Sequence, residues 1–182
     1  RIPFYNTYRK YAYDKTLVIK AFKAWQDGKD FYEKVYDMDF NNPYVLQQGA
    51  LYLAYKKKFT LAFEWIDKAI TQTNNKYFSI RNSHAIILFE ANINSQNDSS
   101  DIRKQLDNSM EILEKCFNAD KRKVFHAIRY AEQAIEYLNR YYDKKALLYV
   151  ETARTWLKNE YKERSWDREL QNLLLKIEQI KL

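Results

Sequence analysis

The chain has 182 residues, of which 46% are hydrophobic and 30% are charged, with a formal net charge of +7. This composition excludes a disordered chain, because it provides enough apolar side chains for a buried core. No apolar run approaches the roughly 18 residues that a membrane-spanning helix needs. We therefore expect a soluble, cytoplasmic protein with no membrane partner, and the basic excess makes nucleic acid a partner class to consider.

Residues that break helices are scarce, since the chain contains two glycines and two prolines. β-Hairpins with tight turns would require more of both, so the sequence predicts an all-α protein. The single cysteine, Cys116, excludes an internal disulfide and fits a reducing compartment. The chain begins with Arg1 rather than Met, and we expect it to be part of a longer protein.

Apolar residues at helical spacing predict helices along the whole chain. The first two are expected over residues 16–25 and 30–38. Asn42 and Pro43 suit the N-cap and the first turn of the next helix. The polar segment NSQNDSS, residues 94–100, predicts a loop. The remaining helices are predicted over residues 43–57, 59–71, 77–92, 101–117, 122–141, 144–159 and 166–182, the last of them capped by Ser165.

A small–bulky–small pattern recurs in the second helix of three predicted helix pairs. Its members are Ala62, Ile66 and Ala69, then Ser109, Leu113 and Cys116, and then Ala146, Val150 and Ala153. The two small residues of each set are seven residues apart, nearly two helical turns, so they share one helix face. Small side chains let a neighbouring helix approach closely while the bulky one fills the groove. The pattern predicts helix hairpins that stack on one another.

The segment from Pro43 to Lys76 resembles a tetratricopeptide repeat (TPR), a helix hairpin with a period of about 34 residues. Its residues 58–70, KFTLAFEWIDKAI, match the second-helix signature F-x-x-A-x-x-x-I-x-x-A. The contact positions of its first helix are occupied by Leu46, Gly49, Ala50 and Leu53. The resemblance implies an all-α, right-handed α–α superhelix of degenerate TPR-like hairpins with a terminal capping helix.

The implied domain is a single one over residues 1–182. Its hairpins are expected at about residues 8–40, 43–73, 77–117 and 122–159, followed by the terminal helix 166–182. The spacing between pattern copies is uneven: 47 residues separate Ala62 from Ser109, and 37 separate Ser109 from Ala146. A non-repetitive helical bundle is therefore the alternative fold.

Residues 41–70, 78–93 and 110–138 resemble the C-terminal helical regions of bacterial STAND-type NTPases and Sir2-linked antiphage defence proteins. In those proteins such a region senses a target and an upstream domain acts. The resemblance implies a non-catalytic protein-recognition or scaffold module, the target-sensing or regulatory part of a larger multidomain bacterial protein, with antiviral defence as its setting.

The sequence contains no glycine-rich phosphate loop and no paired-Cys metal spacing. We therefore expect no enzyme, no catalytic residue, no cofactor and no metal. Arg81 with His84, and Arg122 with His126, faintly resemble the Arg…His motif of HEPN ribonucleases. Two and three residues separate these pairs, where that family has four to six. A HEPN-like ribonuclease is a further alternative.

The first helices of the hairpins are expected to line a concave surface that binds a protein or an extended peptide. Asn82 and Arg129 match two positions of the carboxylate clamp of some TPR proteins, but Gln47 and Leu51 replace its Lys and Asn. Arg129 and Arg81 are expected either to bind an acidic partner or to pair with glutamates of the chain such as Glu132. The expected partner-binding residues are Tyr44, Gln47, Tyr55, Phe78, Arg81, Asn82, Phe89, Phe125 and Arg129.

Lysines in the turns are the basis of the alternative partner, nucleic acid. Lys56, Lys57 and Lys58, and later Lys144 and Lys145, lie between the two helices of a hairpin, where they suit phosphate contacts. The corresponding middle turn is neutral to acidic and interrupts the row, which favours solvated turns instead. Self-association through the terminal helix or the open edge of the stack is a third partner class.

Overall fold

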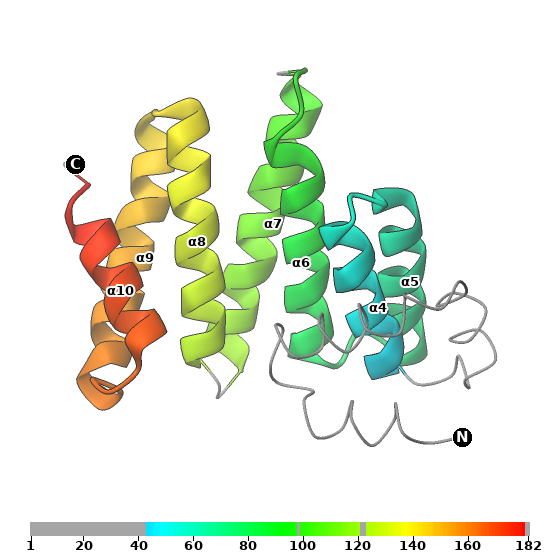
Figure 1. The fold of residues 1–182 in the computed structure, drawn as a ribbon, viewed down its shortest axis with the longest axis horizontal. Coiled ribbons are helices and arrows are strands. Elements are labelled where there is room, and N and C mark those ends of the chain that lie inside the picture. The colour runs from blue at the N-terminus through cyan, green and yellow to red at the C-terminus, as the bar shows by residue number, and fades with distance from the viewer. Residues whose placement is uncertain (1–42, 98, 121–122, 181–182) are drawn as a thin grey trace. The chain divides into compact units, whose positions relative to one another are not determined.

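The computed structural model of the chain describes residues 43–97, 99–120 and 123–180 (Figure 1). These residues form seven α-helices and no strand, which confirms the all-α prediction. The predicted helices 16–25 and 30–38, the hairpin 8–40 and the Asn42 N-cap lie outside the described residues. The helices are α4 (Pro43–Tyr55), α5 (Phe59–Gln72), α6 (Phe78–Ile93), α7 (Ser100–Ala119), α8 (Lys123–Tyr141), α9 (Lys144–Glu163) and α10 (Arg168–Glu178).

The last two helices differ from their predicted bounds. Helix α9 continues to Glu163, where the backbone N–H of Arg164 bonds to the carbonyls of Glu160 and Tyr161 and ends it. Helix α10 is capped by Asp167, not Ser165: the Asp167 carboxylate accepts from the backbone N–H groups of Glu169 and Leu170, at 3.0 and 3.2 Å. A charged cap oxygen satisfies donors at the positive end of the helix dipole, and α10 therefore begins at Arg168.

The chain divides into two compact units, residues 1–87 and 88–182, and the division falls inside α6. The single domain predicted over residues 1–182 stays a prediction. In the first unit α4 packs on α5. In the second, α7 packs on α8, α8 packs on α9, and α10 packs on both α8 and α9.

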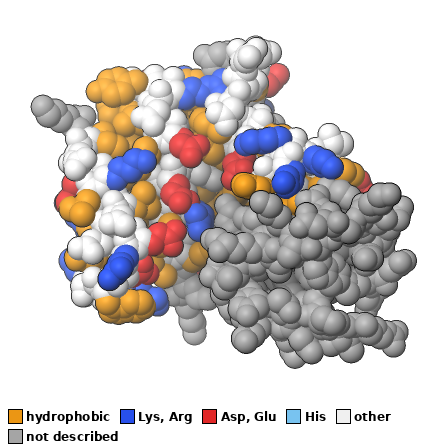
Figure 2. Space-filling view, in the orientation of Figure 1, with side chains coloured by type: hydrophobic (Ala, Val, Ile, Leu, Met, Phe, Trp, Pro, Cys, Tyr) orange, Lys and Arg blue, Asp and Glu red, His pale blue; other side chains and the backbone are white. Residues whose placement is uncertain are grey.

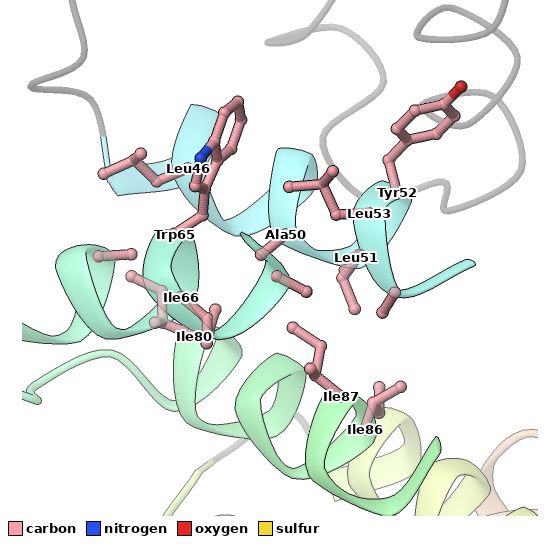
Figure 3. Packing of buried hydrophobic residues seen from close by; sticks show 13 residues of the cluster. Leu46, Ala50, Leu51, Tyr52, Leu53, Trp65, Ile66, Ile80, Ile86 and Ile87 are labelled. Atoms are coloured by element: carbon pink, nitrogen blue, oxygen red, sulfur yellow. The ribbon is translucent and has the colours of Figure 1, made fainter. Parts of the chain in front are cut away.

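The core of the first unit lies between α4, α5 and the first part of α6 (Figure 3). Its largest side chain is Trp65, which is 2% exposed. Helix α4 places Gly49 against this indole, and a Cβ added at Gly49 would overlap the ring of Trp65. The apolar residues that surround Trp65 in the cluster include Leu46, Ala50, Leu53, Ile66, Ile80 and Ile87.

Aromatic rings join the helices of the second unit. Phe117 of α7 stacks on Trp156 of α9, with ring centroids 3.8 Å apart and an interplanar angle of 3°. Tyr130 of α8 lies against the same indole, at 4.6 Å, and Tyr137 of α8 meets Tyr149 of α9 edge to face at 5.2 Å. Such pairs add to the stabilisation from buried apolar area. Many of the aromatic side chains in the sequence therefore pack in the core of this unit.

The small–bulky–small pattern is fully buried in all three copies. Ala62 and Ala69, Ser109 and Cys116, and Ala146 and Ala153 are each 0% exposed, as are the intervening Ile66, Leu113 and Val150. The helices that carry the pattern are α5, α7 and α9, and each belongs to a packed helix pair. The packing role predicted for these small residues is confirmed.

Ala62→Leu is expected to lower the free energy of unfolding by about 1–3 kcal/mol, because a fully buried contact has no room for three further carbons. Urea unfolding followed by circular dichroism measures the change. The matched control is Thr60→Leu, which adds bulk on the exposed face of the same helix and should change stability by less than about 0.5 kcal/mol. Equal stabilities of the two variants would contradict the packing role.

Candidate binding surfaces

Three of the residues expected to bind a partner are enclosed by the chain itself. Gln47, Asn82 and Phe89 are 5%, 0% and 1% exposed. The Gln47 amide donates to the Ser79 carbonyl at 2.9 Å and to Ser83 Oγ at 2.8 Å, and it thereby links α4 to α6. A buried side chain cannot contact a partner, so these three residues are not part of an exposed binding surface.

Arg81 holds a turn of the first unit. Its Nε donates to Asn75 Oδ1 at 2.8 Å, and its Nη2 donates to the Asn75 carbonyl. Asn75 has a φ of 57°, a left-handed conformation that asparagine tolerates better than most residues. The Arg81 guanidinium also lies over the half-buried ring of Phe78, 5.5 Å from its centroid. These contacts fix the turn between α5 and α6.

Two expected residues with large rings are exposed, and the side chain of Tyr44 is outside the described part. Tyr55, at the end of α4, is 56% exposed, and Phe125, in the first turn of α8, is 41% exposed. Most large apolar side chains of the described residues are buried instead. Exposed rings of this size are available for contact with a partner.

Arg129 pairs within the chain, which is one of the two alternatives that the sequence left open. Its guanidinium lies 2.5 Å from a Glu132 oxygen and 3.7 Å from a Glu169 oxygen. The same group lies 5.7 Å from the ring centroid of Phe125. The pair with Glu169 ties α8 to the first turn of α10 and neutralises the charge expected to select an acidic partner.

One stripe of α8, together with the first turn of α10, is exposed or half-buried. We define the α8 face as Phe125, Arg129, Glu132 and Glu136 of α8 with Glu169 of α10. The four α8 residues follow the spacing four, three, four along the helix, and all are exposed or half-buried. Figure 2 shows acidic side chains in a row along α8 on the viewed face. The α8 face therefore combines the exposed ring of Phe125 with charged side chains around it.

Asp107 of α7 is the centre of a polar cluster in the second unit. Its Oδ1 accepts from the hydroxyls of Tyr137 and Tyr149, at 2.8 and 3.0 Å. Its Oδ2 lies 2.7 Å from Lys145 Nζ. Burial raises the pKa of both tyrosine hydroxyls, and the negative charge of Asp107 raises it further. The cluster joins α7, α8 and α9, and it neutralises a lysine that the sequence placed in a solvated turn.

Two further basic residues of the second unit are held by the chain. Arg103 forms an ion pair with Asp143, which raises the pKa of Arg103. Asp143 caps α9, and the bond from the backbone N–H of Ala146 lowers the pKa of the Asp143 carboxyl. Arg140 donates to the carbonyls of Asn92 at 2.9 Å and Ser95 at 3.0 Å, and so fixes the turn after α6. These contacts join residues at no regular spacing, so the sequence pattern did not predict them.

The histidines and the cysteine lie in packed surroundings. His126 Nε2 is 3.0 Å from Asp120 Oδ2, and the His126 side chain is 1% exposed. Burial lowers the pKa of His84, whose ring meets Phe63 edge to face. Cys116 is a buried free thiol. Within residues 43–97, 99–120 and 123–180 there is no group of three or more His, Cys, Asp or Glu side chains placed to hold a metal ion.

None of the helices in the described part combines the length and the apolar character needed to cross a bilayer. No family model, no curated protein and no solved structure matches the chain.

Proposed function

We propose that this chain is a non-catalytic protein-recognition module built from TPR-like helix hairpins. The observation that carries the proposal is the α8 face, where Phe125 is 41% exposed beside charged side chains. Protein interfaces commonly have an aromatic anchor surrounded by a polar rim. Phe125 supplies the anchor, and Arg129, Glu132, Glu136 and Glu169 supply the rim.

The rim is held in place before any partner arrives. Arg129 is fixed between Glu132 and Glu169 and lies against the Phe125 ring. Side chains that are already ordered lose less conformational entropy on binding. The partner is a protein that places an apolar side chain on Phe125 and basic groups beside the glutamates, because complementary charge favours that pairing.

Helix α10 packs on α8 and α9, as the capping helix of a repeat array does. Its Leu170 and Ile177 are fully buried, and Arg168, Glu169, Gln171 and Asn172 are exposed or half-buried together with Leu175, which is 53% exposed. The polar residues fit a capping role, whereas Leu175 offers an apolar contact for self-association through α10. Sedimentation at several protein concentrations distinguishes the two roles.

The wider role follows from the resemblance of residues 41–70, 78–93 and 110–138 to helical sensor regions of bacterial defence proteins. In this proposal the chain is the target-sensing or regulatory part of a larger cytoplasmic protein, and an upstream domain supplies the activity. The pattern F-x-x-A-x-x-x-I-x-x-A of α5 supports the TPR-like assignment, since its Ala62, Ile66 and Ala69 are all buried.

The proposal is tested by affinity capture from a bacterial lysate with quantitative mass spectrometry. Phe125→Ala with Glu136→Lys removes the anchor and reverses one rim charge, and we expect at least about a tenfold loss of a captured protein. Leu148→Ala with Glu163→Lys, both on exposed positions of α9, is the matched control and should retain it. Equal capture by both variants would rule out the α8 face as the recognition surface.

A further inference from the structure

The positive charge of the chain is concentrated in one short part. Residues 43–87 contain six Lys or Arg and two Asp or Glu, a net charge of +4. Residues 88–182 contain 17 basic and 16 acidic residues, a net charge of +1. Residues 43–87, a quarter of the chain, therefore carry +4 of the net charge of +7. Basic charge gathered in one place attracts anionic partners more strongly than the same charge spread out.

Within the first unit, three consecutive lysines and two aromatic rings share the turn between α4 and α5. We define the basic turn as Tyr55, Lys56, Lys57, Lys58 and Phe59. All three lysines are exposed, Tyr55 is 56% exposed and Phe59 is half-buried. Figure 2 shows Lys and Arg side chains together with hydrophobic ones at this end of α4 and α5. The basic turn is an open surface of mixed cationic and aromatic character.

Two lysines of the basic turn are held differently from Lys145 of the second unit. Lys145 is bound to Asp107, whereas Lys56 and Lys57 make no ion pair with any residue in the described ranges. Their ammonium groups lie over rings instead: Lys56 Nζ is 5.7 Å from the Tyr55 centroid, and Lys57 Nζ is 5.6 Å from that of Phe59. Since a ring does not cancel a positive charge, both ammonium groups retain the capacity to bind an anion.

We infer that the basic turn binds single-stranded nucleic acid, a function beyond the proposed protein recognition and on a different surface. Proteins that bind single strands combine lysines that contact phosphates with exposed rings on which bases stack. The lysines here supply the first feature, and the Tyr55 ring supplies the second. An acidic peptide would use the same lysines but would have no need of an exposed ring.

The test measures fluorescence anisotropy of a fluorescein-labelled oligo(dT) of about 20 nucleotides with the full chain. Each phosphate contact on a single strand contributes about −0.7 to the slope of log affinity against log salt. Three lysine contacts give a slope of about −2, so binding should weaken roughly 20-fold between 50 and 200 mM NaCl. Absence of binding at 50 mM NaCl would overturn the inference.

Matched variants separate the lysines from net charge. The triple variant Lys56→Gln, Lys57→Gln and Lys58→Gln should weaken binding at 50 mM NaCl by at least about tenfold and remove most of the salt dependence. The control triple variant, Lys104→Gln, Lys162→Gln and Lys176→Gln, alters three exposed lysines of the second unit. It changes net charge equally and should leave most binding intact. Circular dichroism shows that each variant is folded. Equal losses in the two triple variants would mean non-specific attraction and would overturn the inference.

A second pair of variants tests the ring. Tyr55→Phe keeps a ring on which a base can stack and should bind as the wild type does, whereas Tyr55→Leu should bind about tenfold more weakly. A poly-glutamate peptide of equal charge serves as competitor. If the peptide competes as well as unlabelled oligo(dT) and Tyr55→Leu binds normally, the partner is an acidic protein and the nucleic-acid inference is wrong.

Discussion

Gly49→Ala is expected to destabilise the first unit by about 1–3 kcal/mol, even though alanine is the better helix former. No described glycine has a positive φ, so the backbone of α4 would accept alanine at this position. The obstacle is the indole of Trp65, which occupies the space that a Cβ at Gly49 would take. Trp65 is 2% exposed and is surrounded by the core cluster, so its ring has little room to move.

Removing the indole should reverse the sign of the Gly49→Ala effect. Trp65→Ala alone is expected to cost about 3–5 kcal/mol, because it leaves a large cavity in the core. In that background the methyl group at position 49 meets no ring, and the helix gains about 0.5–1 kcal/mol from replacing glycine. The experiment is a double-mutant cycle by urea unfolding, and a Gly49→Ala effect of equal sign and size in both backgrounds would contradict the contact.

Much of the helical fold could be predicted from the sequence because its determinants are local. The small residues at seven-residue spacing, such as Ala146 and Ala153, mark a helix face without knowledge of the partner helix. The helix bounds from α4 to α8 were predicted to within two residues for the same reason. The capping residue of α10 was predicted wrongly, since Ser165 and Asp167 are both residue types that cap helices. Asp167 caps α10 and accepts a hydrogen bond from the backbone N–H of Leu170, whose side chain is buried against other helices. That burial is a tertiary property.

Which of the predicted binding residues are exposed is decided by tertiary contacts, and the sequence pattern does not predict those contacts. Alignment of the hairpins treats Gln47 and Tyr55 as equivalent concave residues, yet Gln47 is buried by hydrogen bonds to α6 and Tyr55 is exposed. The contact between Asp107 and Tyr149 spans 42 positions of the chain. Periodicity does not report such long-range polar pairs. Tyr55 and Phe125 retain the exposure that partner binding requires.

The buried tyrosines of the second unit predict a steep loss of stability at alkaline pH. Burial raises the pKa of Tyr130, Tyr137 and Tyr149, with a further increase from the charge of Asp107 for the last two and of Glu114 for Tyr130. In the unfolded chain these hydroxyls ionise at a pKa near 10. Above that pH the unfolded state binds fewer protons than the folded state, so rising pH favours unfolding. The stabilising contribution is complete below about pH 10 and decreases as pH rises towards the folded pKa values.

The expected slope is about 1.4 kcal/mol per pH unit for each tyrosine, and about 4 kcal/mol per unit for the three together. Urea unfolding between pH 9 and 11.5 measures it. Tyr149→Phe should reduce the slope by about a third, because one of the three titrating groups is removed. The slope is the informative quantity, since the same change also removes a hydrogen bond to Asp107 at every pH. Tyr142→Phe removes a hydroxyl from a 70% exposed residue and is the matched control. Identical slopes for the two variants would mean that the alkaline transition does not arise from the buried hydroxyls.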